Sequence, residues 1–310
     1  MKILAFGVTG FVGRHLVPHL LGRGHALTVA ARSGRHGFGP AVQVVEADPT
    51  IPGPWQDLVK GYDAVINLAG APVMTRWNAA GKKTILESRT VGTRNIVDAL
   101  SRVADGGKTL LCAGAIGYYG DGGDLVLTED APQGQGFLAE VSAAWQAEAL
   151  RAEGFGHRVV IPRIAVVLGD GGALTRMLTP FSLGLGGRLG SGRQWFSWIH
   201  VRDLVRVMTF LIEEPRARGV VNACAPSPVT NAEFTRILGQ TLRRPAILPV
   251  PAPVLRLVLG EAASMLLTGQ RCIPEALARL GFSFEHPELG PALHDIVAPP
   301  SPGSSMGRRG

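Results

Sequence analysis

The chain has 310 residues, of which 46% are hydrophobic and 18% are charged, and its formal net charge at pH 7 is +7. A chain of this size buries a large core, as one α/β unit or as two smaller domains. The basic residues are scattered and no aromatic residues are interleaved with them, so no nucleic-acid partner is expected. No apolar run reaches the ~18 residues that a spanning helix needs, so no membrane partner is expected.

Cysteine usage and the position of the first strand bear on the compartment. Cys112, Cys224 and Cys272 form no C-x-x-C pair, which favours reduced structural thiols. The first predicted strand begins at residue 2 and leaves no room for a signal peptide before it. We therefore expect a cytoplasmic protein that acts on a small-molecule substrate, as a monomer or a homodimer.

The first thirteen residues, MKILAFGVTGFVG, predict a strand, a glycine loop and the start of a helix. Lys2–Phe6 is a short apolar run of the kind found in buried parallel strands, and a helix pattern follows over residues 14–22. Gly7 permits a tight turn, Gly10 lets the backbone approach a pyrophosphate, and Gly13 lets the helix pack closely on the strand. Free N–H groups of the first helical turn then meet the phosphates, so the loop is predicted to bind a nucleotide.

Further apolar runs predict the rest of a parallel sheet, over Ala26–Ala31, Val42–Ala47, Ala64–Leu68, Lys108–Ala113, Arg158–Pro162 and Val220–Cys224. Helices are predicted between the strands, over residues 79–100 and 137–152, then from Asn231, and over most of Val254–Ile296. This alternation predicts an α/β fold, a doubly wound parallel Rossmann sheet with a smaller C-terminal substrate-side domain.

The same pattern predicts how the chain divides into domains. Residues 1–170 are expected to form the nucleotide-binding Rossmann domain, to which strands near 199–225 return, and residues 171–297 the smaller substrate-side and C-terminal domain. The tail over residues 298–310 consists mainly of Pro, Ser, Gly and Arg and is expected to be disordered.

The end of the second predicted strand indicates which dinucleotide binds. Arg32 stands there and Arg35 follows, with no Asp or Glu nearby. An acidic residue at this place holds the ribose 2′-hydroxyl of NAD, whereas an arginine accommodates the 2′-phosphate of NADP. NADP is therefore the expected cofactor, and the alternative is that Arg32 is only a solvated surface residue.

The chain up to about Val297 resembles one branch of the atypical short-chain dehydrogenase/reductases, the epimerase-like proteins with an extra C-terminal domain of unknown function. The motifs that carry the resemblance share order and spacing: GVTGFVG (7–13), INLAGAP (66–72), RW (76–77), SR (88–89), GYYG (117–120), GFLAEVSAAW (136–145), VVLGDGGAL (166–174), GSGRQWFSWIHVRDL (190–204) and NACAPSPVTNAEF (222–234). The resemblance implies NADP(H) as the cofactor, bound by Gly7, Thr9, Gly10, Phe11, Val12, Arg32, Asn67, Leu68, Lys83, Ser88 and Val166.

The usual catalytic set of short-chain dehydrogenases is replaced in this sequence. In those enzymes a Tyr-x-x-x-Lys pair places a general acid/base and a charge that lowers its pKa on one helix face, beside a Ser or Thr. Here the corresponding positions are Ala115, Phe137 and Val141, and no Tyr-x-x-x-Lys occurs anywhere in the chain.

Two hypotheses about function follow from this replacement. In the first, the protein is an NADP(H)-dependent oxidoreductase or epimerase acting on a small polar substrate, which can be anionic or resemble a nucleotide sugar. Tyr118 is then the candidate acid/base, although a packed aromatic residue explains it as well, and Lys83 replaces the missing lysine. In the second, the protein binds NADP(H) without turnover, as a sensor or regulatory module, for example in cell division.

The stretch Gly184–Trp198 is expected to build the substrate-side wall, which favours the enzyme over the sensor. Trp195, Phe196 and Trp198 supply apolar area, and Arg163, Arg188 and Arg193 supply charges for an anionic group. His200 and Asp203 are expected to brace this loop. A His-x-x-Asp pair without further ligands is not a metal signature, so no metal is expected.

Overall fold

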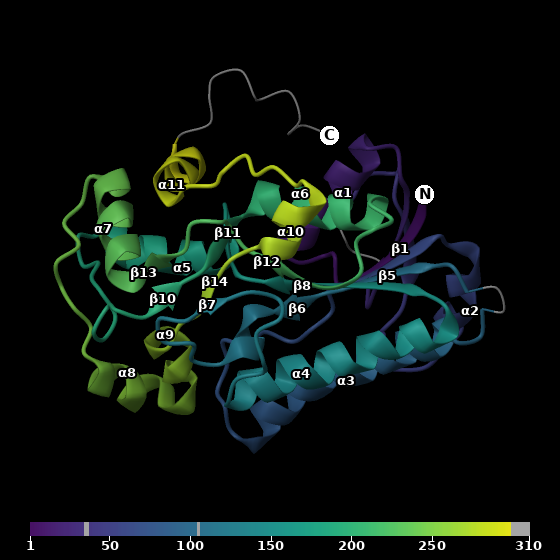
Figure 1. Cartoon of the computed structure of the whole chain (residues 1–310), viewed down its shortest axis with the longest axis horizontal. Coiled ribbons are helices and arrows are strands. Elements are labelled where there is room, and N and C mark those ends of the chain that lie inside the picture. Colours follow the sequence, from purple (N-terminus) through teal and green to yellow (C-terminus); the bar gives the residue numbers. More distant parts are fainter. Residues whose placement is uncertain (34–36, 104–105, 299–310) are drawn as a thin grey trace.

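The computed structural model describes residues 1–33, 37–103 and 106–298, and a parallel β-sheet forms its centre (Figure 1). The strand order is β12-β8-β5-β4-β1-β2-β3. The strands are β1 (Lys2–Phe6), β2 (Ala26–Ala31), β3 (Gln43–Glu46), β4 (Ala64–Asn67), β5 (Thr109–Cys112), β8 (Arg158–Ile164) and β12 (Gly219–Ala223), and the short β6 (Gly114–Ala115) pairs beside β8. The sequence predicts all seven strands of this path, and the α/β fold class is confirmed.

Helices cover both faces of the sheet, which explains why the strands are continuous apolar runs. Helices α1 (Phe11–Gly22) and α6 (Val201–Glu213) lie on one face, and α3 (Ala79–Leu100) and α4 (Phe137–Leu150) lie on the other (Figure 1). In β1, Ile3 belongs to the core on the α1 and α6 side, whereas Leu4 and Phe6 belong to the core on the α3 and α4 side. Successive residues of one strand thus build two different hydrophobic cores.

The strand order reverses between β1 and β4, which fixes where a ligand can enter. On one side of this point the chain winds through β1, β2 and β3, and on the other through β4, β5 and β8. The loops that leave the carboxyl ends of β1 and β4 therefore diverge, and in this type of sheet the ligand occupies the crevice between them.

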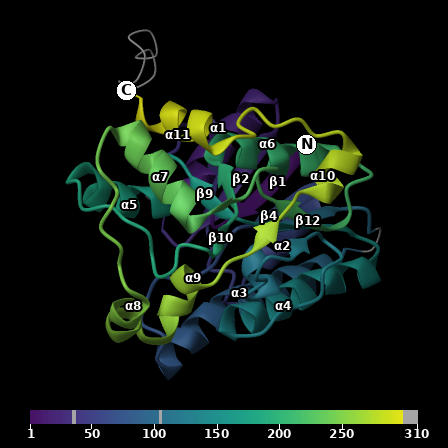
Figure 2. The same ribbon diagram turned by 60° about the vertical axis from the view of Figure 1, so that its left-hand side comes forward.

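The remaining elements gather beyond the carboxyl ends of the sheet strands (Figure 2). The helices are α2 (Trp55–Leu58), α5 (Gly172–Ser182), α7 (Asn231–Leu242), α8 (Ala252–Leu259), α9 (Ser264–Leu267), α10 (Glu275–Leu280) and α11 (Leu289–Val297). Two of them lie away from this group: α2, and α10, which packs beside β12 on the sheet face that carries α1 and α6. Three small sheets accompany them, β9 (Val166–Leu168) with β11 (Trp198–His200), β7 (Val126–Leu127) with β14 (Arg271–Cys272), and β10 (Trp195–Phe196) with β13 (Val229–Thr230).

The C-terminal region is mostly helical over Val254–Ile296, as the sequence predicts, but its helices are short. Four short helices are separated by β14 and by turns, because Gly260 and Gly281 adopt φ angles of +59° and +83° and so end the helices before them.

The predicted disordered tail over residues 298–310 falls, apart from Ala298, outside the described residues, as does Arg35. The domain boundary near residue 170 stays a prediction. No helix in the described part of the chain has the length and hydropathy needed to cross a membrane.

The contact between α1 and β1 gives the first testable prediction. A Cβ atom on Gly13 would lie 1.9 Å from the Val8 carbonyl oxygen, whereas a Cβ on Gly22 in the same helix meets nothing within 4 Å. We expect Gly13→Ala to lower the free energy of unfolding by about 3 kcal/mol through overpacking. Gly22→Ala should instead raise it by ~0.5–1 kcal/mol, because alanine is the better helix former. Urea denaturation measures both, and equal stabilities would contradict the packing described here.

Candidate functional site

A cavity of about 650 Å³ lies at the carboxyl ends of β1, β4 and β5, at the reversal of strand order. Its walls come from the glycine loop, from the ends of β4 and β5, from the start of α4 and from residues 264–270 of the C-terminal region. Of the residues that the resemblance assigns to cofactor binding, the structure brings these to the cavity wall: Gly7, Gly10, Phe11, Val12, Leu68 and Val166.

The glycine loop reaches this position because two of its glycines pack directly on backbone. Gly7 has a φ of +73°, and a Cβ there would lie 2.3 Å from the backbone nitrogen of Ala69. The loop therefore passes against the end of β4, and α1 begins at Phe11 with its first N–H groups at the cavity. A helix N-terminus presents unpaired N–H donors and the positive end of its dipole, which suits an anionic group such as a pyrophosphate.

The positions of the missing catalytic set lie in this cavity. Ala115, Phe137 and Val141 all contribute to its wall, where they present methyl, phenyl and isopropyl groups. Trp77 packs edge-on against Phe137 with ring centroids 5.0 Å apart. The site where ordinary short-chain dehydrogenases carry hydroxyl and ammonium groups is therefore apolar in this protein.

Arg89 is the cation that the structure places in the cavity wall. It is half-buried on α3, and its guanidinium carbon lies 5.2 Å from the ring centroid of Trp145. Nη1 donates to the carbonyls of Ala71 and Ile85 at 3.0 and 3.1 Å. None of the ion pairs between described residues involves Arg89, and burial lowers its pKa to about 10. Its Nε and Nη2 have no hydrogen-bond partner in the described chain, and they lie against Gly70, where a Cβ atom would come within 3.3 Å of each.

Lys83, which the sequence suggests as the replacement for the missing lysine, does not line the cavity. Its side chain is 69% exposed and pairs with Glu87 at 3.8 Å. Five residues separate Lys83 from Ser88, a rotation of about 140° around the helix, so the two cannot share a face. Seven residues separate Lys82 from Arg89, which is within about 20° of two full turns. Lys82 accordingly pairs with Glu261 across the mouth of the cavity, and its Nζ lies 5.3 Å from the Phe137 ring centroid.

Several other predicted cofactor contacts do not line the cavity. Asn67 is buried and its amide donates to Thr93 Oγ1 at 2.9 Å, so its side chain holds β4 to α3. Ser88 Oγ accepts the Ala71 N–H at 2.9 Å and fixes the loop after β4. Thr9 and Arg32 are exposed, Arg32 directly after the end of β2, where the 2′-phosphate was expected.

Tyr118, the predicted acid/base, does not line the cavity, although Gly117 and Gly120 beside it do. Its ring lies under the Arg163 guanidinium, 3.5 Å from the carbon atom to the ring centroid. Arg163 is buried and donates to Tyr119 Oη and to Gln146 Oε1, both at 2.8 Å. Arg163 is therefore engaged with protein groups rather than held ready for an anionic substrate. Burial also raises the pKa of Tyr119 to about 12, which makes it a poor proton donor.

The predicted aromatic wall over Trp195–Trp198 packs inside the protein. Trp198 is fully buried and donates to the Ser227 carbonyl at 3.1 Å, and Phe196 packs on Phe234 with ring centroids 4.4 Å apart. Trp195 donates to Asp124 at 2.9 Å. The apolar wall of the cavity comes instead from Val73, Trp77, Phe137, Leu138 and Met265. The sequence places Phe137 in the site through the replaced catalytic set, but it does not predict that Val73, Trp77, Leu138 and Met265 join it, because these residues come from three separate segments.

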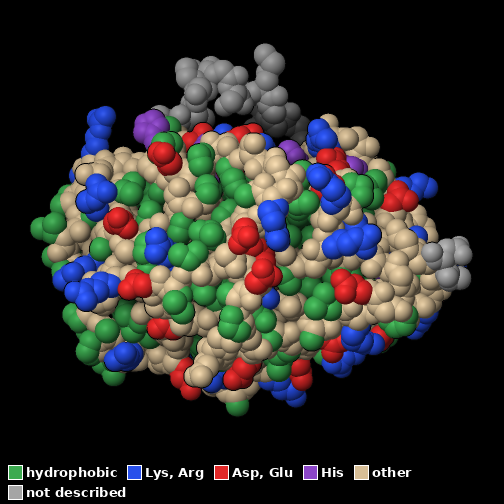
Figure 3. Space-filling view, viewed as in Figure 1, with side chains coloured by type: hydrophobic (Ala, Val, Ile, Leu, Met, Phe, Trp, Pro, Cys, Tyr) green, Lys and Arg blue, Asp and Glu red, His purple; other side chains and the backbone are tan. Residues whose placement is uncertain are grey.

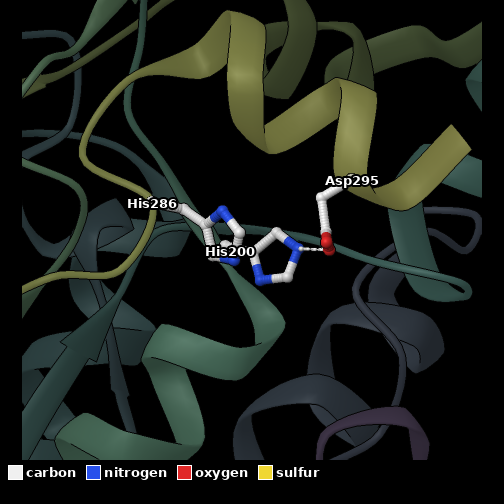
Figure 4. A group of neighbouring side chains, drawn as sticks. All are labelled: His200, His286 and Asp295. Carbon is white, nitrogen blue, oxygen red and sulfur yellow. Dashed lines mark ion pairs between the residues drawn. The ribbon is translucent and has the colours of Figure 1, made fainter. Parts of the chain in front are cut away.

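His200, His286 and Asp295 form the cluster whose atoms could in principle hold a metal ion (Figure 4). One candidate ligand atom from each lies within 4.8 Å of the other two. However, His200 Nδ1 accepts the Arg202 N–H at 3.1 Å and so caps α6. The neutral ring then carries its proton on Nε2, which lies 3.3 Å from Asp295 Oδ2. A metal ion on Nε2 would need that lone pair free, so we assign no metal.

The cluster instead braces the C-terminal region. Asp203 accepts the backbone N–H groups of Glu285 and His286, each at 2.8 Å, and the His200 and His286 rings lie 3.9 Å apart. His200 and Asp203 thus hold the segment that leads into α11, and not the substrate-side loop for which the sequence suggested them.

Strand order, glycine loop and crevice together define a Rossmann-type fold of the dinucleotide-binding class. The sequence profile of the NAD dependent epimerase/dehydratase family matches residues 3–224, and that of a domain of unknown function, DUF1731, matches residues 250–296. The chain belongs to the NAD dependent epimerase/dehydratase family, which confirms the resemblance inferred from the motifs.

Individual relatives match over most of their length. The chain is 42% identical to the chloroplastic epimerase family protein SDR39U1 homolog of Arabidopsis thaliana, over 96% of this chain and 87% of that protein. It is 35% identical to epimerase family protein YfhF of Bacillus subtilis, over 96% and 98%. The crystal structure of human epimerase family protein SDR39U1 with NADPH superposes with a TM-score of 0.85 at 37% identity, covering 96% of this chain and 99% of the human one.

The His200 cluster gives a prediction for the pH dependence of stability. Burial, then the neighbouring His286, lower the pKa of His200 to about 4, and Arg202 acts in the same direction, whereas Asp295 and Asp203 raise the pKa. Between about pH 4 and 6.5 the unfolded chain therefore binds a proton at this residue that the folded protein does not. We expect stability to fall by on the order of 2–3 kcal/mol as the pH drops through this window.

The variant His200→Asn keeps a cap acceptor for α6 but does not titrate. Its free energy of unfolding, measured by urea denaturation from pH 7 to pH 4, should depend less on pH than that of the wild type. Identical pH profiles would contradict the role given to His200.

Proposed function

We propose that the protein is an NADP(H)-dependent oxidoreductase that binds a small substrate against Arg89. The observation that carries this proposal is a half-buried guanidinium on the cavity wall, without a carboxylate partner and with two free donor nitrogens. Desolvating a cation without pairing it is costly, so such a group is retained where a ligand supplies the missing negative charge.

The same geometry supports NADP(H) as the cofactor. The pyrophosphate would lie on the N–H groups at the start of α1, the 2′-phosphate beside Arg32, and the nicotinamide half within the 650 Å³ cavity. The human relative was crystallised with NADPH, and its chain is 37% identical to this one. When bound, this cofactor supplies or accepts a hydride.

Arg89 and Ser142 are the groups that this chain offers to the reacting oxygen. As a carbonyl is reduced, its oxygen gains negative charge, which the fixed positive charge of Arg89 stabilises. Ser142 lies on α4 at the cavity wall and offers a hydroxyl hydrogen bond. No Tyr, His or Lys stands among the described lining residues, so the proton comes from water and completes the alcohol.

The lining restricts the substrate class. The charged residues of the described lining are Arg89 and Asp121, and the remaining wall is largely apolar. This favours a small molecule with an apolar body and one carbonyl or anionic group directed at Arg89. An epimerase that returns the hydride to the opposite face of the same carbon would use the same groups.

A second function, NADP(H) binding without turnover, is supported by a specific observation. Ala115, Phe137 and Val141 leave the cavity without the usual acid/base and its activating cation. The two functions differ in one measurement, the transfer of deuterium from labelled NADPH to a panel of aldehydes and 2-keto acids. Product labelling supports the oxidoreductase, whereas tight NADPH binding with no labelling across the panel supports the sensor.

The cytoplasmic location stays a prediction, since the Arabidopsis relative is named chloroplastic.

The assignment of Arg32 predicts a preference between the two cofactors. We expect NADPH to bind at least tenfold more tightly than NADH, because the guanidinium forms a charge-assisted pair with the 2′-phosphate. Arg32→Ala should weaken NADPH and leave NADH unchanged in a fluorescence titration. Equal affinities of the wild type for the two nucleotides would reject NADP as the cofactor.

Three variants on α3 test the role of Arg89. Arg89→Met removes the cavity's cation and should slow carbonyl reduction at saturating NADPH by on the order of tenfold or more, the value of one charged hydrogen bond to the reacting oxygen. Lys83→Ala removes an exposed cation from the same helix and should leave the rate within error. Arg89→Lys should recover part of the loss, which separates charge from packing. Turnover of the panel carbonyls, with circular dichroism as a folding control, makes the comparison, and equal effects of Arg89→Met and Lys83→Ala would rule out this role.

A further inference from the structure

A second cavity, of about 660 Å³, lies in the C-terminal half of the protein and shares no lining residue with the cofactor cleft. It lies between α7 and the extended segment that follows α7. The Val250 N–H donates to the Arg188 carbonyl at 2.9 Å and the Leu248 N–H to the Gly186 carbonyl at 3.2 Å, so the chain before Leu189 closes one side. The lining residues are Arg188, Ala232, Thr235, Arg236, Gly239, Gln240, Arg243, Arg244, Ala246, Ile247 and Pro249.

The charge of this cavity has one sign. Arg188, Arg236, Arg243 and Arg244 line it. The last three belong to the stretch of residues 235–260, which contains neither Asp nor Glu. The nearest acidic residues along the chain have partners elsewhere. Glu233 accepts hydrogen bonds from Thr230 in the cap of α7, and Glu261 pairs with Lys82. Figure 3 shows basic side chains over this end of the molecule, with hydrophobic and some acidic ones among them.

The charges of the four arginines that line the cavity are not compensated by ion pairs. Carboxylates elsewhere pair with Arg23, Arg94, Arg151, Arg202, Arg206 and Arg216. No ion pair between described residues involves the four of the cavity, a property they share with other arginines such as Arg102 and Arg218. Arg188 donates to the Ser191 carbonyl at 3.3 Å and Arg236 to Gln240 Oε1 at 3.0 Å, so these hydrogen bonds leave their charge in place. What distinguishes the four is that they line one cavity together.

The backbone at Arg243 adds an independent observation. Arg243 ends α7 with a φ of +53°, and it is the non-glycine residue with positive φ in the described chain. Glycine or asparagine usually takes this position, and other residues adopt it at a cost of about 1 kcal/mol. The favourable interaction between the Arg243 charge and the negative end of the α7 dipole offsets part of that cost. This interaction does not explain why Arg244 and Arg188 line the same cavity.

Apart from Thr235 and Gln240, the remaining lining carries no polar side chain, which narrows the ligand class. Ala232, Ala246, Ile247 and Pro249 line the cavity next to the arginines, and Ile247 is 79% exposed. Arginine binds phosphate oxygens with two parallel hydrogen bonds, and several arginines together suit a group with more than one negative charge. The cavity volume is within the range of small-molecule sites.

We propose that this cavity is a second ligand site, which binds a phosphate-bearing molecule with an apolar body through Arg188, Arg236, Arg243 and Arg244. The phosphate belongs either to a soluble phosphorylated metabolite or to the headgroup of an anionic lipid, since both present the same chemistry. The site is separate from the cofactor cleft, and it exists whether or not the protein turns over a substrate.

The test uses the full chain saturated with NADPH, which keeps phosphate probes out of the cleft. Calorimetry at low salt measures binding of inorganic tripolyphosphate, and sedimentation measures binding to phosphatidylglycerol vesicles and to phosphatidylcholine vesicles. The variant Arg243→Glu with Arg244→Glu reverses two exposed charges at the cavity. The matched control, Arg102→Glu with Arg218→Glu, makes the same change in net charge at exposed arginines outside it.

We expect tripolyphosphate to bind the wild type and the control alike, and the cavity variant at least tenfold more weakly. Binding to phosphatidylglycerol vesicles alone, with the same dependence on Arg243 and Arg244, also supports the site and assigns the phosphate to a lipid. Equal binding by cavity variant and control shows that only net charge matters and overturns the proposal. Loss of all binding under saturating NADPH overturns it too, because the probe then occupied the cofactor cleft.

Discussion

The position of the whole cleft depends on backbone packing around the glycine loop. Gly7 passes so close to Ala69 that no side chain fits between the end of β1 and the end of β4, and Gly13 rests on Val8 in the same way. These contacts hold the start of α1 against the reversal of strand order in the sheet. Donor N–H groups and a positive helix end therefore face the cavity before any ligand arrives.

Within that frame, the electrostatics of the cavity differ from the familiar short-chain dehydrogenase pattern. The helix that usually brings a tyrosine and a lysine brings Phe137 and Val141, so α4 supplies mainly apolar area. The cation comes from the neighbouring helix, α3, through Arg89. An arginine stays charged at any physiological pH, so it can stabilise developing charge but is a poor proton shuttle.

The sequence predicts the sheet well because buried parallel strands leave a strong local signal. Lys2–Phe6 and Ala26–Ala31 are apolar runs next to turn residues, and their bounds agree with β1 and β2. Side-chain direction is harder to predict, because a helix rotates by about 100° per residue and an error of one position moves a group to another face. Lys83 illustrates this, because its side chain is exposed and pairs with Glu87, whereas Arg89, two turns beyond Lys82, lines the cavity.

Long-range contacts could not be predicted from local pattern at all. The environment of His200 depends on His286 and Asp295, which lie more than eighty residues further along the chain and are brought together only by the C-terminal fold.

A crystal structure of the protein with NADPH would test the central claim most directly. We predict that the nicotinamide half lies in the cavity beside Ala115 and Val141, with Arg89 Nε or Nη2 within hydrogen-bond distance, ~3 Å, of the cofactor or of a substrate oxygen. A nicotinamide outside this cavity, or one held by Lys83 or Tyr118 while Arg89 contacts only protein, would contradict it.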